Sequence, residues 1–244
     1  MRPRLRPLVL VLALLVAACG SGDAGDLTAA RPTVAETDTP GHDHAPPAAA
    51  GADRVAGSQL QQTLVPQPDV TGYQGAVLDR PVPKPDFTLT DTSGEPYDFR
   101  AETADAAVTF LYFGYTTCPD ICPGHMAALA TALREVDPAV AEEVEVVFVS
   151  VDPERDEDLL RQYLDSFDES FVGLTGEPAE INRVMDGMGL HPSAIAEDGD
   201  FPPSHPINII TFTGESSQIA YPFGVNGAAI AQDLPRLVDE GVVL

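Results

Sequence analysis

From residue 73 onwards, hydrophobic residues follow two alternating patterns. Continuous or alternating apolar runs predict strands at 85–91, 97–99, 107–113, 144–151, 171–174, 206–212 and 218–221. Apolar residues three or four positions apart predict helices at 126–136, 159–167, 181–188 and 230–238. The first two strands, joined by a turn, predict an N-terminal β-hairpin. Because strands alternate with helices, the pattern predicts an α/β domain over 73–244, with a central sheet flanked by helices.

The first 18 residues, 1–18, have the pattern of a signal peptide. Three arginines open the segment, and an uncharged apolar run follows at 8–18. That run is shorter than the roughly 20 residues that cross a bilayer. It ends in Val16-Ala17-Ala18-Cys19-Gly20, which resembles the lipobox of bacterial lipoproteins. The resemblance implies cleavage before Cys19, lipidation of its thiol and a location on the outer face of the cell membrane. The alternative is an ordinary secretory signal.

The segment 19–72 has the composition of a disordered, lipid-anchored linker. It is rich in Pro, Ala, Gly, Thr and Asp, and it contains no Phe, Tyr or Trp. Such a segment cannot bury enough apolar surface to fold. Its motif Gly41-His42-Asp43-His44 offers two imidazoles that can bind Cu²⁺ or Zn²⁺ weakly. The alternative is a polar patch without a ligand.

The charge of the chain excludes two classes of partner. The chain carries 13 Lys+Arg against 38 Asp+Glu, a formal net charge of −25. Nucleic acid requires a basic surface, so we expect no nucleic-acid binding. Anionic lipid attracts basic patches in the same way. Membrane attachment is therefore expected through the lipid anchor alone.

Two of the three cysteines form a motif at the end of a buried strand. If Cys19 carries lipid, Cys118 and Cys122 remain, in Thr117-Cys118-Pro119-Asp120-Ile121-Cys122-Pro123. A helix N-terminus follows, and its dipole favours a thiolate. Four residues apart on a helix, two Cβ atoms lie about 5–6 Å apart, whereas a relaxed disulfide needs about 3.5–4.5 Å. A bound soft metal, a redox pair and a structural disulfide are the three alternatives.

The histidines of the predicted domain are not equally suitable as metal ligands. His205 stands just before the strand 206–212, where a loop meets the sheet edge and can bring a distant ligand to the cysteines. His125 follows Cys118 by seven residues, but prolines on either side of Asp120 disturb the helical spacing. We therefore expect His125 to be exposed and without a ligand role.

Two acidic residues lie near the predicted site in sequence. Asp120 stands between the cysteines and Asp152 ends the strand 144–151. Asp120 can tune the cysteines electrostatically or act as a further ligand, and Asp152 can lie near the site. The alternatives are a helix N-terminal acid for Asp120 and a turn or capping residue for Asp152.

Three segments together resemble the Sco/SenC family: 113–123, 149–156, and His205 before a β-hairpin. The resemblance covers roughly 80–244 and implies a thioredoxin-like fold. It also implies a membrane-anchored copper chaperone that helps to build the binuclear copper centre of cytochrome c oxidase. The ligands would be the thiolates of Cys118 and Cys122 and the imidazole of His205. One residue departs from the family: Ser204 replaces the usual Asp, a carboxylate that can orient the histidine ring.

Ligand chemistry agrees with copper, as Cu(I) or Cu(II). Thiolates select soft Cu(I), imidazole suits copper generally, and structural zinc needs four protein ligands rather than three. The implied partners are a copper donor, a thiol reductant and the copper-receiving subunit of a respiratory oxidase. The second hypothesis is an extracytoplasmic thiol–disulfide oxidoreductase that uses Cys118 and Cys122 as its redox pair. In that case His205 would be incidental.

Overall fold

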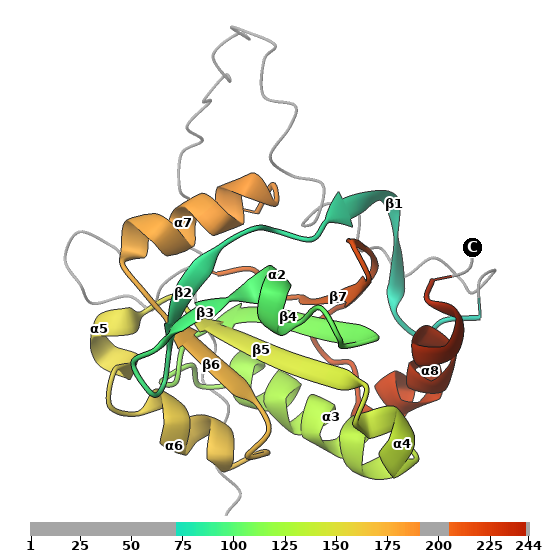
Figure 1. Cartoon of the computed structure of the whole chain (residues 1–244). Coiled ribbons are helices and arrows are strands. Elements are labelled where there is room, and N and C mark those ends of the chain that lie inside the picture. The colour runs from blue at the N-terminus through green and yellow to red at the C-terminus, as the bar shows by residue number, and fades with distance from the viewer. Residues whose placement is uncertain (1–71, 191–204, 243–244) are drawn as a thin grey trace, which may run out of the picture. The chain divides into compact units, whose positions relative to one another are not determined.

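The computed structural model describes residues 72–190 and 205–242 (Figure 1). Residues 1–71 lie outside this part of the chain, so the predicted signal peptide, Cys19, the linker and the pair His42 and His44 stay predictions. No helix within the described part is long and apolar enough to cross a membrane.

One sheet of eight strands forms the centre of the described part, in the order β1-β8-β7-β4-β5-β6-β2-β3. Its strands are β1 (Ala76–Pro83), β2 (Thr88–Asp91), β3 (Pro96–Asp98), β4 (Val108–Gly114), β5 (Val144–Ser150), β6 (Val172–Thr175), β7 (Ile209–Thr213) and β8 (Ser216–Tyr221). The sheet is mixed, because β4, β5 and β6 run parallel while the other neighbouring pairs are antiparallel.

Helices join and flank the strands. They are α2 (Phe99–Glu102), α3 (Ile121–Glu135), α4 (Pro138–Ala141), α5 (Pro153–Asp156), α6 (Leu160–Asp165), α7 (Pro178–Gly187) and α8 (Gly227–Glu240). In Figure 1, α3 and α6 lie on one side of the sheet and α7 lies on the other. The structure is therefore the α/β fold that the hydrophobic pattern predicts.

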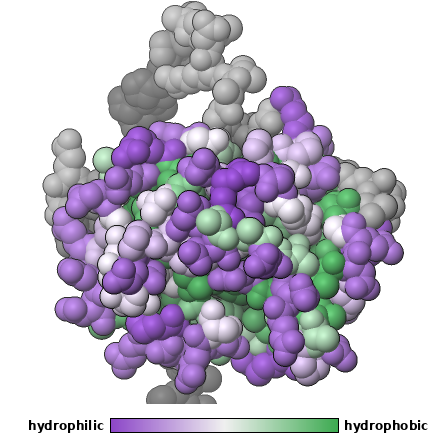
Figure 2. Space-filling model, viewed as in Figure 1, coloured by the Kyte–Doolittle hydropathy of each residue, from purple (hydrophilic) through white to green (hydrophobic). Residues whose placement is uncertain are grey.

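The central strand β4 is the most deeply buried part of the sheet. Every residue from Val108 to Gly114 is buried, because β5 pairs with one edge, β7 pairs with the other, and helices cover the faces. This confirms the interpretation of a continuous apolar run as a strand covered on both sides. Hydrophilic residues cover most of the face drawn in Figure 2, with hydrophobic patches between them.

Several elements differ from the prediction. The strand expected over 206–212 begins only at Ile209, and β1, α2, α4 and α5 were not predicted. The expected hairpin is present as β2 and β3, and it joins the sheet through β6. Helices of four residues carry too little periodicity to be detected in a sequence.

A buried carboxylate connects the start of the described part to its last helix. Asp233 in α8 accepts hydrogen bonds from the backbone N–H groups of Gln74 and Gly75 and from the hydroxyl of Tyr221. All three donors would lose a partner if this carboxylate were absent. The contact fixes the chain before β1 against α8 and β8.

Candidate metal centre

The two cysteines lie between the end of β4 and the first turn of α3. Cys118 precedes the helix and Cys122 is within its first turn, and both are free thiols in the buried interior. The side chain of Cys122 reaches β4 because Gly114 leaves room. A Cβ at that position would lie 2.9 Å from Cys122 Sγ and 2.8 Å from the Tyr112 ring, closer than real Cβ atoms approach.

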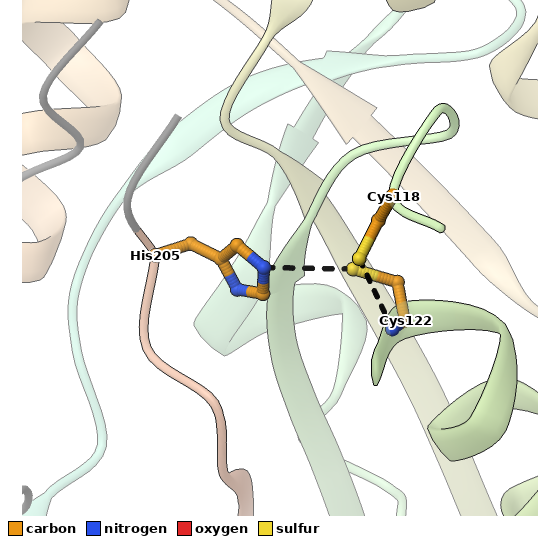
Figure 3. A group of neighbouring side chains, drawn as sticks. All are labelled: Cys118, Cys122 and His205. Carbon is orange, nitrogen blue, oxygen red and sulfur yellow. Dashed lines mark hydrogen bonds between the residues drawn. The ribbon is translucent and has the colours of Figure 1, made fainter. Parts of the chain in front are cut away.

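His205 completes the group from a segment 83 residues later in the chain. Its Nε2 atom lies 3.7 Å from Cys122 Sγ. The ligand atoms of Cys118, Cys122 and His205 all lie within 4.8 Å of one another, and Figure 3 shows them pointing toward one another. The structure therefore brings together the three side chains that the sequence analysis selected.

A backbone carbonyl orients the ring of His205. Nδ1–H donates to the carbonyl oxygen of Pro206 at 2.9 Å. Because a carbonyl can only accept, the proton belongs on Nδ1, and Nε2 presents its lone pair to the sulfur of Cys122. Burial lowers the pKa of His205, although the carbonyls of Pro206 and Phe113 act in the opposite direction. The Pro206 carbonyl thus orients the ring, as a carboxylate can do at other metal-binding histidines.

The two thiols have different acidities. Burial raises the pKa of Cys118, but hydrogen bonds, first among them that of the Cys122 backbone N–H at 3.4 Å, outweigh burial and lower the pKa overall. Burial raises the pKa of Cys122 to about 12. Cys118 is therefore the thiol that ionises first and Cys122 is the one that holds its proton.

Two tyrosines surround the group, and the sequence analysis did not identify their role. The hydroxyl of Tyr112 donates to Cys122 Sγ at 3.5 Å, and the hydroxyl of Tyr115 is hydrogen-bonded to Cys118. Both rings meet the ring of His205 edge-on, with centroids 6.1 and 5.5 Å away. The available signal was a tyrosine inside an apolar strand, since a buried phenol needs a hydrogen-bond partner.

Asp156, fully buried, was also missed. Its carboxylate accepts hydrogen bonds from the backbone N–H and the hydroxyl of Thr116 and from the hydroxyl of Ser150, at 2.6–3.1 Å. Burial raises its pKa, although the bonds from Ser150 and Thr116 oppose the shift. Asp156 thereby joins α5 to the segment that carries Cys118. The signal was a carboxylate in the segment 149–156, but its partner Thr116 lies 40 residues away in sequence, where no local pattern could identify it.

The two acidic residues considered in the sequence lie at the edge of the site. Asp152 is buried and pairs with Arg155, whose Nη1 lies 2.9 Å from Oδ2. Asp120 is exposed at the start of α3, where its side chain makes no capping hydrogen bond. Neither belongs to the group of possible metal ligands.

The expectation of an exposed His125 was wrong. His125 is only 1% exposed, because α3 turns it toward β4 and the end of β8. Its ring packs edge-on against Tyr112, and Nε2 donates to the Pro222 carbonyl at 3.4 Å. Burial lowers its pKa to about 4. It is not among the clustered side chains Cys118, Cys122 and His205.

Comparisons with known proteins point to one family. The SCO1/SenC family model matches residues 78–239. Protein SCO1 homolog 1 of Arabidopsis thaliana mitochondria is 36% identical over 137 residues, which are 55% of this chain but only 39% of that protein. The chain thus matches less than half of the length of this relative.

Solved structures agree with the family match. Apo Sco1 of Thermus thermophilus superposes with a TM-score of 0.60 at 29% identity, over 69% of this chain and 98% of that one. Bradyrhizobium japonicum ScoI with copper bound superposes with a TM-score of 0.54 at 31% identity, over 64% and 98%. The fold is therefore thioredoxin-like, as the resemblance implied.

Replacing Asp156 should loosen the segment that carries Cys118. In Asp156→Ala, three donors lose their acceptor, so we expect the free energy of unfolding to fall by about 2–4 kcal/mol in urea titrations. Asp156→Asn keeps the size and one acceptor, so its free energy of unfolding should fall by less than that of Asp156→Ala.

Because the pKa of Asp156 is raised in the folded state, the free energy of unfolding of the wild type should fall as pH rises above about 4, with no such contribution in Asp156→Asn. Equal stability of wild type and Asp156→Ala would contradict the assignment.

Alkylation should distinguish the two thiols. With limiting iodoacetamide at neutral pH, the reduced protein should be modified first at Cys118, which has the lower pKa, and only slowly at Cys122. Peptide mass mapping over time gives both rates. In the Cys118→Ser control, Cys122 should stay slow until the protein is unfolded. Equal rates in the folded protein would refute the asymmetry.

Proposed function

Since the chain belongs to the SCO1/SenC family, we propose that it is a membrane-anchored copper metallochaperone for a respiratory copper enzyme such as cytochrome c oxidase. One observation carries the proposal: two sulfur atoms and one imidazole nitrogen converge within 4.8 Å. Cys118, Cys122 and His205 are the proposed ligands. Copper is the cargo that the protein passes on.

The distances in the group suit a small metal ion. An ion about 2.0–2.3 Å from two ligand atoms, at an angle of about 120°, holds them about 3.7 Å apart. Cys122 Sγ and His205 Nε2 are separated by 3.7 Å. Two thiolates and an imidazole form a donor set that suits copper. The copper-bound state of the related Bradyrhizobium ScoI supports the same choice of metal.

The same group can release its cargo. Three protein ligands leave a coordination position open, which a ligand of the receiving protein can occupy. Cys118 is 8% exposed while Cys122 is fully buried, so a partner approaches from the side of Cys118. Exchange begins there, while Cys122 and His205 still hold the ion.

We further propose that the protein is anchored to the outer face of the cell membrane and acts with three kinds of partner. Cleavage before Cys19 and lipidation of its thiol would anchor the protein, and 19–72 would be the tether. Thiols outside the cytoplasm tend to oxidise, so the chaperone needs a thiol reductant as well as a copper donor. The recipient would be the copper-receiving subunit of a respiratory oxidase.

The unequal thiols favour a second candidate function, thiol–disulfide exchange. The Cys118 thiolate would attack a target disulfide and form a mixed disulfide, releasing one target thiolate. Cys122, once deprotonated, would then attack Cys118 Sγ and release the second target thiolate. The target gains two electrons and the chain ends as the Cys118–Cys122 disulfide. This activity would survive loss of His205, which separates it from copper delivery.

Copper binding tests the main proposal. The reduced chain without residues 1–18, with Cys19→Ser to remove the third thiol, should bind one copper per molecule. His205→Ala should bind copper at least 10-fold more weakly, because removal of a ligand exceeds the 10- to 100-fold losses caused by outer-shell changes. His125→Gln, which changes a histidine outside the group, should retain the affinity. Equal affinity of His205→Ala and the parent protein would remove His205 from the site.

The hydroxyl of Tyr112 should tune the copper site through Cys122. In Tyr112→Phe the sulfur loses a hydrogen bond and donates more charge to copper. The thiolate-to-Cu(II) absorption band should move to longer wavelength, and the reduction potential should fall. Tyr163→Phe is the matched control, because the buried hydroxyl of Tyr163 has no hydrogen-bond partner among the described residues. Identical spectra of Tyr112→Phe and the control would contradict this role.

A further inference from the structure

The cysteine–histidine group lies at one end of the sheet. β4 and β5 run parallel and both end there, while β7 runs antiparallel to β4 and begins there. β8 also ends there, because Tyr221 pairs with Ile209. The surface around Cys118 therefore includes the segments that follow β4, β5 and β8 and the segment that precedes β7.

The segments next to β7 and β8 expose two large apolar side chains. Ile207, 41% exposed, lies two residues after His205, and Phe223, 47% exposed, lies two residues after the end of β8. The ring of Phe223 packs edge-on against His125, with centroids 6.0 Å apart, and His125 in turn packs against Tyr112. Contacts within the fold thus hold Phe223 near the group while its other side faces solvent.

The segment after β5 is acidic instead. Glu154, Glu157 and Asp158 are exposed in α5 and just after it, and Asp120 is exposed at the start of α3. The nearby positive charge of Arg155 is paired with Asp152. One flank of the group is therefore apolar, and the other exposes mainly acidic side chains, with one apolar side chain, Leu159, next to them.

We propose that this end of the sheet is a docking surface for a copper-receiving protein domain that combines an apolar patch with lysine or arginine side chains. Ile207 and Phe223 are the apolar anchors, and the acidic flank pairs with the basic side chains. The inference rests on the proposed function, since it names the face through which copper leaves.

Charge selects this partner over a second copy of the chain. Each copy carries a formal charge of −25, so the acidic flanks of two copies would repel. A basic partner is attracted, and its encounter rate rises at low salt. Buried aromatic and aliphatic anchors act mainly on how long the complex survives. The two flanks therefore have separable effects on transfer.

Copper transfer kinetics test the surface. The donor is the copper-loaded chain without residues 1–18, carrying Cys19→Ser. The acceptor is the metal-free, soluble copper-receiving domain of the respiratory oxidase from the same organism. The double variant Ile207→Ser/Phe223→Ser should keep its copper affinity and unfolding midpoint, yet transfer copper at least 10-fold more slowly. The matched control Val140→Ser alters a half-buried apolar residue of α4 at the opposite end of the sheet, and should transfer normally.

Salt separates the acidic flank from the apolar one. The triple variant Glu154→Gln/Glu157→Gln/Asp158→Asn should associate at least 10-fold more slowly than wild type at low ionic strength and about equally at 1 M salt, where the screening length is about 3 Å. Unchanged association at low salt would overturn the charge complementarity.

Other results of these experiments would overturn either the docking surface alone or the proposed function as well. Normal transfer by Ile207→Ser/Phe223→Ser would overturn the docking surface, and so would a loss of copper affinity in that variant, which would make these residues part of the binding site. Sedimentation that shows a dimer of wild type but not of this variant would assign the surface to self-association and overturn the proposal. If wild type binds no copper, the proposed function fails and this inference falls with it. If wild type binds and transfers copper, only the docking surface remains in question.

Discussion

The antiparallel pairing of β4 with β7 is the contact on which the cysteine–histidine group depends. It places Leu111 opposite Ile210, so the end of β4 that leads to Cys118 lies beside the segment that carries His205. A slip by one residue would turn every side chain of one strand to the other face. Because both faces of β4 are buried along its whole length, such a slip would disrupt the packing on both faces, and the register is held firmly. The geometry of the ligands is therefore a consequence of core packing.

Hydrogen bonds from buried polar groups then fix the positions of the side chains that the sheet brings together. Asp156 holds the segment before Cys118, Tyr112 donates to Cys122, and the Pro206 carbonyl sets the proton of His205. Each of these polar groups loses water on burial and recovers a hydrogen bond within the protein. A ligand set held in this way needs little rearrangement to accept a metal ion. The same rigidity limits how far the thiols can move during exchange.

The two proposed chemistries draw on one pair of sulfur atoms. A dithiol can hold copper, whereas a disulfide cannot offer two thiolates. The hydrogen bonds that favour the thiolate of Cys118 serve either activity, because a thiolate is both the ligand and the nucleophile. His205 distinguishes them, since an imidazole adds a copper ligand but disulfide exchange does not require one. The acidic and apolar flanks around the group concern the partner rather than the chemistry.

The sequence by itself determined the α/β class and the buried central strand, because long apolar runs are local signals. The motif around Cys118 indicated two candidate ligands, and the third, His205, was selected from its position before a strand and from the family resemblance. It did not reveal β1, whose eight residues include two charged residues and two prolines, or the four-residue helices, whose patterns are too short. Only the tertiary structure decided that His125 is buried and that Asp156 binds Thr116, 40 residues away. It also decided that a carbonyl, rather than a carboxylate, orients His205. These features arise from packing of α3 on β4 and from contacts between distant segments, which no local pattern in the chain encodes.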